Sequence, residues 1–421
     1  MSPSGDAAVK YSARATSALI SGDVSLTIGD AALTVTGLFD VVEVPYADVN
    51  ALAMRDYAVH LETDAGPYDF AGLGSWCQPF FDALCAAYNK AVLRSLFVVG
   101  GPSLVARGDW RFTEAGQVGA GVAPVQVFEN CVVTLPNDLL ARRVPLAFVT
   151  GMNVAGFEVT LGLDDGATYQ WAKLGFDTAP FVQAVQAKLR ALRDTALAQV
   201  TAIDASLTPA QASQLAKMMP AGTAVPVGKL AGVAPSFVAA LEARIAQTCA
   251  ADTYQVFKAM GDPLSISVGF RKVDRRSDVT GGPPDDGDGD ASSLVVTSTD
   301  AASGDQAPQY LMWMIAPSPD GKYVAVEFAQ PNAATFVYRT GGDAAGFAYQ
   351  LNRALEAIDF HREVIRLSDE ELRQPENASY RMAVKRTAAL RFVRANFVER
   401  VIHTSMDAWK ANLQTMWARG L

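Results

Sequence analysis

The residues that most often carry catalysis or bind metal ions are few in this chain and lie far apart. Among its 421 residues there are only three histidines and four cysteines. His60, His361 and His403 have no metal-ligand spacing, and no two cysteines form a Cys-x-x-Cys pair. His60 falls on the polar side of an alternating segment, so we expect it to face solvent. We therefore predict neither a metal ion nor a cofactor.

Two short segments have a superficial likeness to functional sites, and each lacks a part that the chemistry needs. GLGSW at 72–76 contains a serine but not the Gly-x-Ser-x-Gly spacing of a nucleophile elbow. DGDGD at 286–290 matches the first three ligand positions of an EF-hand loop. However, Ala291 stands where that loop needs glycine, and Thr297 where it needs a bidentate glutamate. These segments favour solvated loops over a catalytic serine or a calcium site.

The chain contains an internal repeat. Val44-Pro45 recurs as Val144-Pro145, 100 residues later, and further hydrophobic and turn positions follow at that interval. After the turn glycine the interval becomes 101, a difference that a hairpin loop tolerates. The pattern predicts two copies of one structural unit. The matched positions are Ala47/Ala147, Val49/Val149, Tyr57/Phe157, Val59/Val159, Leu61/Leu161, Asp64/Asp164, Gly66/Gly166, Tyr68/Tyr169, Phe70/Trp171, Leu73/Leu174, Pro79/Pro180 and Phe80/Phe181.

Each copy has the pattern of an antiparallel sheet followed by one helix. Residues 57–61 alternate between apolar and other side chains, which is the period of a half-buried strand, with Tyr57 on the apolar side. An Asp-x-Gly turn leads into a returning strand. Phe80, Leu84 and Tyr88 then form one stripe of a helix. We expect about six or seven strands and a closing helix in each copy.

A weaker third copy is predicted near the end of the chain. Its hydrophobic pattern follows the first copy by 267 residues, from a first strand at 264–273 to a helix with Phe347, Leu351 and Leu355. Inside it, residues 277–292 have almost no apolar side chains, and this composition predicts a disordered acidic loop.

Three fragments of the first copy resemble a known superfold. They are LTIGDAALTVTG at 26–37, VPYADVNALAM at 44–54 and YAVHLETDAGPYDFAG at 57–72, followed by the helix. The second copy offers VVTLP at 132–136 and FEVTLGLDDGATYQWAKLG at 157–175. Together they resemble tandem pleckstrin-homology-like domains, in the PH or GRAM-type bacterial form. The resemblance implies a bent, barrel-like sheet capped by its terminal helix, and binding of a ligand, lipid or protein rather than catalysis.

The predicted fold class is α+β. Residues 1–100 and 101–200 would form the first two PH-like domains, and residues 263–366 the third. Residues 201–262 would form a helical connector, because Thr208 and Pro209 are typical of a helix start. Residues 367–421 would form one long, basic, amphipathic helix.

The C-terminal segment differs in charge from the body of the chain. Residues 379–421 contain eight basic and two acidic side chains, a net charge of +6, whereas the whole chain has −9. Leu390, Val393, Phe397 and Val401 form its apolar stripe. Charge favours docking on the chain's own acidic body or self-association with a second copy, and contact with an anionic membrane is the alternative.

Basic residues also gather at the end of the third copy's first strand. PH domains that bind phosphoinositides have cations there, so the resemblance implies an anion or lipid contact. Asp274 and the acidic loop that follows favour a solvated strand end instead. The candidate contact residues are Arg271, Lys272, Arg275 and Arg276 in this cluster, and Arg391, Arg394 and Trp409 in the C-terminal segment.

The composition narrows the class of function. A net charge of −9 disfavours nucleic-acid binding, and neither a signal peptide nor an apolar run of membrane-spanning length is found. Scattered cysteines indicate a reducing, cytoplasmic setting. The sequence predicts a non-enzymatic scaffold with an unknown protein partner. The alternatives are a peripheral membrane adaptor that uses the basic C-terminal helix, and an enzyme with an unrecognised site.

Overall fold

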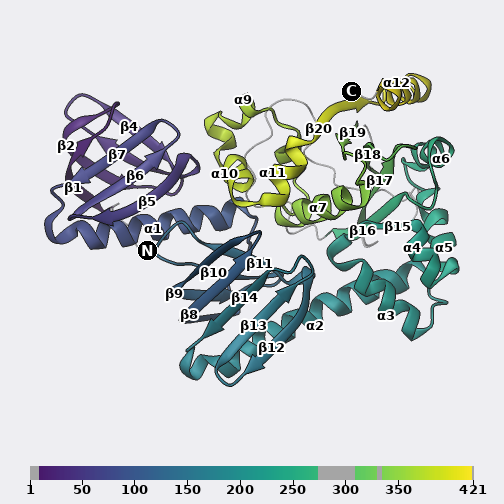
Figure 1. The fold of residues 1–421 in the computed structure, drawn as a ribbon, viewed down its shortest axis with the longest axis horizontal. Helices are drawn as coiled ribbons and strands as arrows, with labels where there is room; N and C mark the ends of the chain where they lie inside the picture. Colours follow the sequence, from purple (N-terminus) through teal and green to yellow (C-terminus); the bar gives the residue numbers. More distant parts are fainter. Residues whose placement is uncertain (1–8, 274–308, 330–333, 420–421) are drawn as a thin grey trace, which may run out of the picture. The chain divides into compact units, whose positions relative to one another are not determined.

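The computed structural model describes residues 9–273, 309–329 and 334–419, and its fold is α+β with three antiparallel sheets (Figure 1). The described residues divide into two compact units. The first comprises residues up to 188 together with 357–359 and 367–387, and the second comprises 189–356, 360–366 and 388–421. The predicted acidic loop, residues 277–292, lies outside the described residues.

The first sheet belongs to the first copy. Its strand order is β4-β3-β2-β1-β7-β6-β5. The first strand, β1, therefore lies between the antiparallel group β2–β4 and the antiparallel group β5–β7. Helix α1, Cys77–Ser95, follows the last strand. The strands are β1 (Lys10–Thr16), β2 (Ser21–Ile28), β3 (Ala32–Thr36), β4 (Val41–Pro45), β5 (Val49–Arg55), β6 (Ala58–Thr63) and β7 (Gly66–Ala71).

The second sheet has the same order, β11-β10-β9-β8-β14-β13-β12, followed by helix α2, Thr178–Ile203. Both copies also have a one-residue register shift near the start of an outer strand, at Val49 and at Val149. The predicted repeat of the first two copies is therefore confirmed. The strands are β8 (Leu104–Glu114), β9 (Gln117–Val127), β10 (Cys131–Thr134), β11 (Arg142–Pro145), β12 (Val149–Ala155), β13 (Glu158–Leu163) and β14 (Thr168–Ala172).

The two cores are built from equivalent aromatic residues. Phe80 of α1 packs edge-on against Phe70 with ring centroids 6.3 Å apart, and Phe181 of α2 packs against Trp171 at 5.4 Å. Phe80 and Phe181 are both fully buried. An amphipathic helix thus covers the apolar face of each sheet, as its stripe of side chains requires.

One pair of repeated aromatics differs from the prediction. Tyr57 and Phe157 were expected on the apolar side of a strand, but they lie in the turns before β6 and β13 and are 85% and 75% exposed. Asp56 and Tyr57 have positive φ angles of 53° and 56°, which is the conformation of a tight hairpin turn. The strand begins one residue later than the alternation indicates, so these rings project into solvent.

The third sheet lies in the second unit and has the simple order β15-β16-β17-β18-β19-β20. It extends beyond the predicted domain at 263–366, because β15 comes from the connector and β20 from the C-terminal segment. Helix α7, Ala344–Ala357, follows β19 and carries the predicted buried residues Phe347, Leu351 and Leu355. The strands are β15 (Val225–Pro226), β16 (Ser267–Val273), β17 (Gln309–Pro317), β18 (Tyr323–Phe328), β19 (Ala334–Arg339) and β20 (Phe397–Ile402).

The connector is helical, and it shares a core with the third sheet. Thr208 forms a capping box with Gln211 at the predicted helix start, and Pro209 occupies the first turn. Phe237 and Phe257 belong to the same buried cluster as Val268 of β16. The connector is therefore part of the second unit's core. Its helices are α3 (Pro209–Met218), α4 (Val227–Val233), α5 (Pro235–Ile245) and α6 (Ala251–Met260).

The C-terminal segment is not the single long helix that its apolar stripe predicts. The segment Phe397–Ile402 forms strand β20, which pairs with β19. Aromatic and β-branched side chains favour a strand there, and pairing with the sheet stabilises it. Along the chain, β20 is preceded by the helices α8 (Glu363–Arg366), α9 (Asp369–Leu372), α10 (Ala378–Arg386) and α11 (Ala388–Ala395), and it is followed by α12 (Met406–Arg419).

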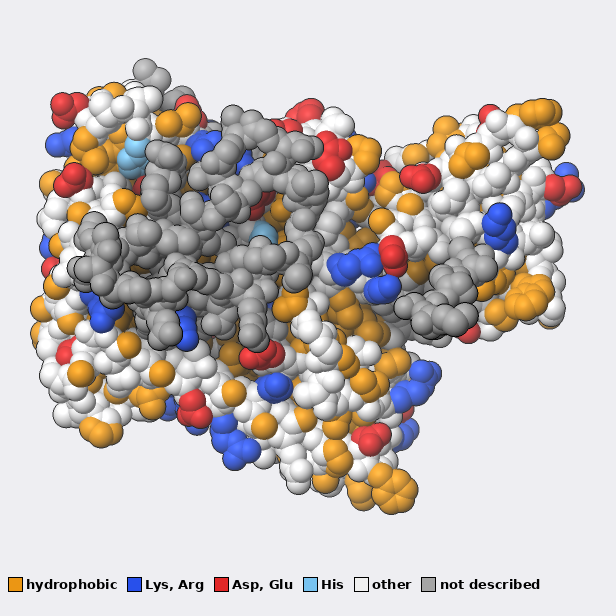
Figure 2. Space-filling view, turned by 180° about the vertical axis from the view of Figure 1, so that it is seen from behind, with side chains coloured by type: hydrophobic (Ala, Val, Ile, Leu, Met, Phe, Trp, Pro, Cys, Tyr) orange, Lys and Arg blue, Asp and Glu red, His pale blue; other side chains and the backbone are white. Residues whose placement is uncertain are grey.

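Within the described residues, no helix combines the length and the apolar character that crossing a lipid bilayer requires. In the space-filling view, acidic and basic side chains lie interspersed over the visible described surface (Figure 2).

Candidate functional site

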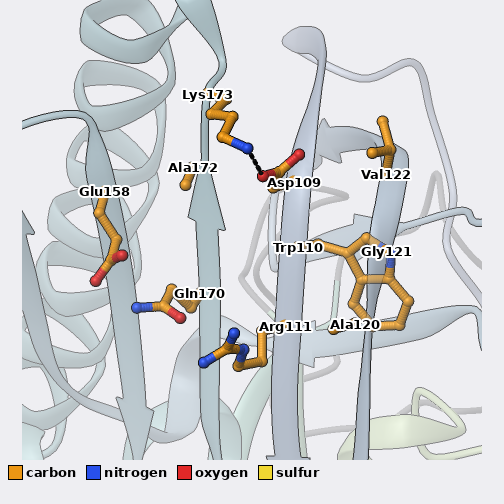
Figure 3. Close-up of a pocket in the computed structure, with 10 residues that line it drawn as sticks. All are labelled: Asp109, Trp110, Arg111, Ala120, Gly121, Val122, Glu158, Gln170, Ala172 and Lys173. Atoms are coloured by element: carbon orange, nitrogen blue, oxygen red, sulfur yellow. Dashed lines mark ion pairs between the residues drawn. The ribbon is translucent and has the colours of Figure 1, made fainter.

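A depression of about 490 Å³ lies on the second sheet, formed by strands β8, β9, β13 and β14 (Figure 3). The pairing of Gln170 with Arg111, and of Arg111 with Ala120, places these three residues in one row across the sheet. Side chains on one sheet face alternate with those facing the core, so this row lies opposite the buried aromatic residues. The lining residues are Asp109, Trp110, Arg111, Ala120, Gly121, Val122, Glu158, Gln170, Ala172 and Lys173.

The depression contains charges of both signs. Lys173 Nζ lies 2.6 Å from Asp109 Oδ2, and this hydrogen bond and charge attraction raise the pKa of the lysine. Arg111, Gln170 and Glu158 lie side by side on the neighbouring strands β8, β14 and β13 (Figure 3). A guanidinium donor, an amide and a carboxylate acceptor could bind a polar ligand or a peptide segment. None of the ten lining residues is a serine, threonine, cysteine or histidine, so the ionisable side chains of the lining are Asp109, Arg111, Glu158 and Lys173.

A second candidate surface lies on the first copy, where helix α10 docks. Arg381 Nη2 lies 2.6 Å from Asp48 Oδ1, and Lys385 Nζ lies 2.9 Å from Asp64 Oδ2. Asp48 is in the turn before β5, and Asp64 is in the turn between β6 and β7. Because the two acidic turns meet at one end of the sheet, they hold two cations one helical turn apart.

The electrostatics of this docking site involve opposing effects. Burial raises the pKa of Asp64, but hydrogen bonds from Asn50 and Lys385 and the charge of Lys385 outweigh burial, so the pKa of Asp64 is lowered overall. Asn50 Nδ2 donates to Asp64 Oδ1 at 2.8 Å. The carboxylate is thus held in its charged form, which favours a basic partner.

The same helix also contacts the second copy and buries apolar surface. Arg386 donates hydrogen bonds to the carbonyl oxygens of Leu139 and Ala141, at 2.6 and 2.5 Å. Tyr380 is buried and its ring lies 6.5 Å from that of Phe97. A basic amphipathic helix is therefore recognised by ion pairs, carbonyl groups and apolar contacts together.

A buried polar network lies in the second unit. The Glu327 carboxylate is 2% exposed, accepts a hydrogen bond from the Thr335 hydroxyl and lies 3.1 Å from His403 Nε2. Trp409 Nε1 donates to Thr335 Oγ1 at 2.7 Å, and the Trp409 ring stacks on the His403 ring at 4.9 Å. These bonds join β18, β19 and α12, so the network fixes α12 on the sheet. Within the described residues, no three histidine, cysteine, aspartate or glutamate side chains are placed to hold a metal ion.

The structure places the predicted contact residues in different surroundings. Arg271 stacks over the Phe360 ring at 4.5 Å, and Lys272 is exposed beside it. Arg275 and Arg276 lie outside the described residues. The predicted cluster is therefore described only at its first two positions.

The three predicted contact residues in the C-terminal segment are also separated. Arg391 is exposed on α11, whereas Arg394 donates hydrogen bonds to the carbonyl oxygens of Val364 and Ile365 at 2.8 and 3.4 Å. Trp409 is fully buried, so it belongs to the core and not to the surface contact that the sequence suggested. The reason is that α12 packs its tryptophans inward, against the second unit's core.

The sequence patterns did not indicate several residues that form these contacts. His60, which was expected in solvent, is half-buried, with Nδ1 2.5 Å from Asp69 Oδ1. Asp64 was predicted only as a turn residue and Asp48 was not singled out, although their ion pairs with Lys385 and Arg381 join positions more than 300 residues apart. The excess of positive charge in the C-terminal segment over an acidic body was the signal that could have indicated such pairs.

No protein-family model matches the chain, and no curated protein matches it significantly.

Proposed function

We propose that this protein is a non-enzymatic, intracellular scaffold for protein interactions, built from tandem PH-like domains. Two observations support the PH-like assignment of the first two copies. Each has a seven-stranded antiparallel sheet in which the first strand lies between two groups of three strands, and a helix follows the last strand. In the third sheet, support comes only from the terminal helix, because the strand order there is a simple meander. None of the four cysteines forms a disulfide, which agrees with a reducing compartment.

The docking of α10 on the first copy is the observation that carries the proposal. The surface formed by α1 and the two turns with Asp48 and Asp64 holds a basic helix from a remote part of the sequence. Such a surface recognises a helix by charge and apolar contact, which is a recurring mode of protein–protein recognition. A partner helix with the same spacing of cations would use the same contacts.

A peptide-binding experiment on the full chain tests this. The double variant Arg381→Glu and Lys385→Glu should release α10, because both cations would then repel Asp48 and Asp64. We expect a labelled peptide of residues 375–388 to bind this variant saturably, and the unmodified chain at least about tenfold more weakly, because α10 occupies the site. A peptide carrying the same two reversals is the matched control. Equal binding, or none, by both peptides would contradict the proposal.

The peripheral-membrane alternative has less support. Arg381, Lys385, Arg386 and Arg394 bind groups of the chain itself, so they contribute less charge to an anionic lipid surface. We expect the full chain to stay with the soluble fraction when anionic vesicles are floated at low salt. Flotation with those vesicles would favour the adaptor function over the scaffold.

A further inference from the structure

Strand β9 has a free edge. β9 pairs with β8 along its whole length, but β10 pairs only with Val125, Gln126 and Val127. Beyond them, Leu135 N–H donates to the Pro124 carbonyl at 3.0 Å. In the part of the chain that the structure describes, no backbone group pairs with residues 117–123 on this side.

The direction of the free backbone groups follows from this register. Along an antiparallel strand, the N–H and C=O of alternate residues point to opposite neighbours. Pro124 points its carbonyl toward β10, so Val122, Ala120 and Val118 point their N–H and C=O groups to the same side, where no strand follows among the described residues. Open edges of this kind bind another strand readily.

The side chains leave this edge accessible. Val118 and Val122 are 75% and 56% exposed, and with Ala120 they lie on the face opposite the core. Gly119 and Gly121 lie across from Phe112 and Trp110. The Phe112 ring fills the space that a Cβ at Gly119 would need, and a Cβ at Gly121 would lie 3.3 Å from Trp110 Nε1. The buried Trp110 Nε1 has no hydrogen-bond partner beside this strand. No charged side chain interrupts residues 117–123.

The edge is symmetric about Ala120. The sequence Val118-Gly119-Ala120-Gly121-Val122 is the same in both directions. The unpaired segment, 117–123, is centred on the same residue, because the hairpin turn at Ala115-Gly116 ends it on one side and β10 on the other. An antiparallel partner with this same sequence would therefore match it residue for residue.

We propose that a second copy of this chain binds here, through antiparallel pairing of the two β9 strands across a two-fold axis at Ala120. Val118 of one copy then pairs with Val122 of the other, and Ala120 pairs with its own equivalent. The Val118, Ala120 and Val122 backbone groups of both copies exchange hydrogen bonds. A two-fold interface of this type is closed, so it gives a dimer and not a filament. The proposal does not depend on the scaffold function.

The first copy shows how the same edge is blocked. In the first copy, Asp23 pairs with Arg14, and Arg14 pairs with Ala71. In the second copy, Val122 pairs with Asp109, and Asp109 pairs with Ala172, the match of Ala71. Asp23 is therefore the equivalent of Val122. A charge at an edge strand opposes pairing with another chain. The corresponding position of the second copy, Val122, carries no such charge.

Sedimentation velocity of the full chain over a range of concentrations tests the dimer. We expect a species of twice the chain mass that dissociates on dilution. Ala120→Pro removes an N–H that points to the free edge, and it leaves the β8 hydrogen bonds intact, so this variant should be monomeric. The double variant Val118→Lys and Val122→Lys places lysines opposite each other and should raise the dissociation constant at least about tenfold. Val105→Lys, an exposed valine away from the edge, is the matched control and should dimerise normally.

Cross-linking locates the axis. In a Cys249→Ser background, Ala120→Cys should form a covalent dimer under mild oxidation. Paired Cα atoms in a hydrogen-bonded antiparallel pair lie about 5.5 Å apart, within disulfide range. Val105→Cys should stay monomeric. A chain that is monomeric at every concentration would overturn the proposal, as would a dimer that persists in the folded Ala120→Pro variant or fails to cross-link at position 120. Folding is checked by circular dichroism.

Discussion

Phe80 and Phe181 show how single residues connect the repeat to stability. Each ring is fully buried and packs against an aromatic residue of the last strand of its sheet. The partners differ, since Phe70 is replaced by Trp171 in the second copy, but the edge-on geometry is kept. Equivalent positions thus make equivalent packing contacts in the two cores, even where the side chains differ.

Truncating either ring should destabilise the protein to a similar extent. We expect Phe80→Ala and Phe181→Ala each to lower the free energy of unfolding by about 3–5 kcal/mol, because each leaves a cavity in a packed core. Urea denaturation followed by circular dichroism measures this. Phe176→Ala, at a fully exposed ring, is the control, with a change within about 0.5 kcal/mol. A loss below about 1 kcal/mol in one of the two core variants would show that the copies are not equivalent.

The ionisation of Asp64 makes the stability of the protein depend on pH. Its pKa is lowered from 3.8, so its ion pair contributes fully above about that pH and is lost as pH falls through the lower, folded-state pKa. We expect Asp64→Asn to reduce stability near neutral pH by about 0.2–1 kcal/mol, because the pair is partly exposed. The difference from the unmodified protein should shrink below pH 3.8. Urea midpoints at pH 7 and pH 3 test this, and a larger difference at the lower pH would contradict it.

At the scale of elements, helix α10 depends on a few well-placed contacts. Arg381 forms the Asp48 ion pair and also donates to the Leu372 carbonyl at 2.5 Å. Its side chain is 13% exposed, so its loss would leave buried acceptors unpaired.

Removal of this side chain should loosen α10. We expect Arg381→Ala to cost about 2–3 kcal/mol of stability, less than the loss of one partner from a fully buried pair. Arg373→Ala on the same segment is the matched control, since that side chain is exposed. Hydrogen exchange of the α10 amides should accelerate in the first variant and not in the second. Unchanged exchange in both would show that the ion pair does not hold the helix.

The elements also show what could be predicted from sequence. The first two sheets and their helices could be predicted, because alternation, turns and helical stripes repeat with a nearly fixed interval. Strand β20 could not, because the Val393, Phe397 and Val401 spacing also fits one face of a helix. The run of Phe397, Val398, Val401 and Ile402 favours a strand, and only the unpaired edge of β19 decides between the two. The depression on the second sheet could not be predicted either, because Arg111, Gln170 and Glu158 lie on different strands and only strand pairing brings them together.

For the whole molecule, the division into two units has a thermodynamic consequence. The first unit contains the two copies and α10, and the second contains the connector helices and the third sheet. The first unit contains the cores of both copies, which α10 contacts together, and the second contains the core that the connector shares with the third sheet. Compact units of this size usually unfold cooperatively.

Calorimetry should therefore resolve two transitions. We expect Leu84→Ala to lower the midpoint of one and Leu351→Ala the midpoint of the other, since both side chains are buried, one in each unit. Each substitution should cost about 2–5 kcal/mol in its own unit. A single transition that both variants shift equally would contradict independent unfolding.

The third sheet draws its first strand from residues 225–226 and its last from 397–402. Because the chain is synthesised from its N-terminus, β19 is made before β20, and until β20 is made one edge of β19 is unpaired. The two preceding sheets are finished much earlier, since each is contiguous in sequence. Mispairing of strands is therefore most expected while the second unit is being synthesised, and we expect chaperones to bind the nascent chain chiefly at that stage.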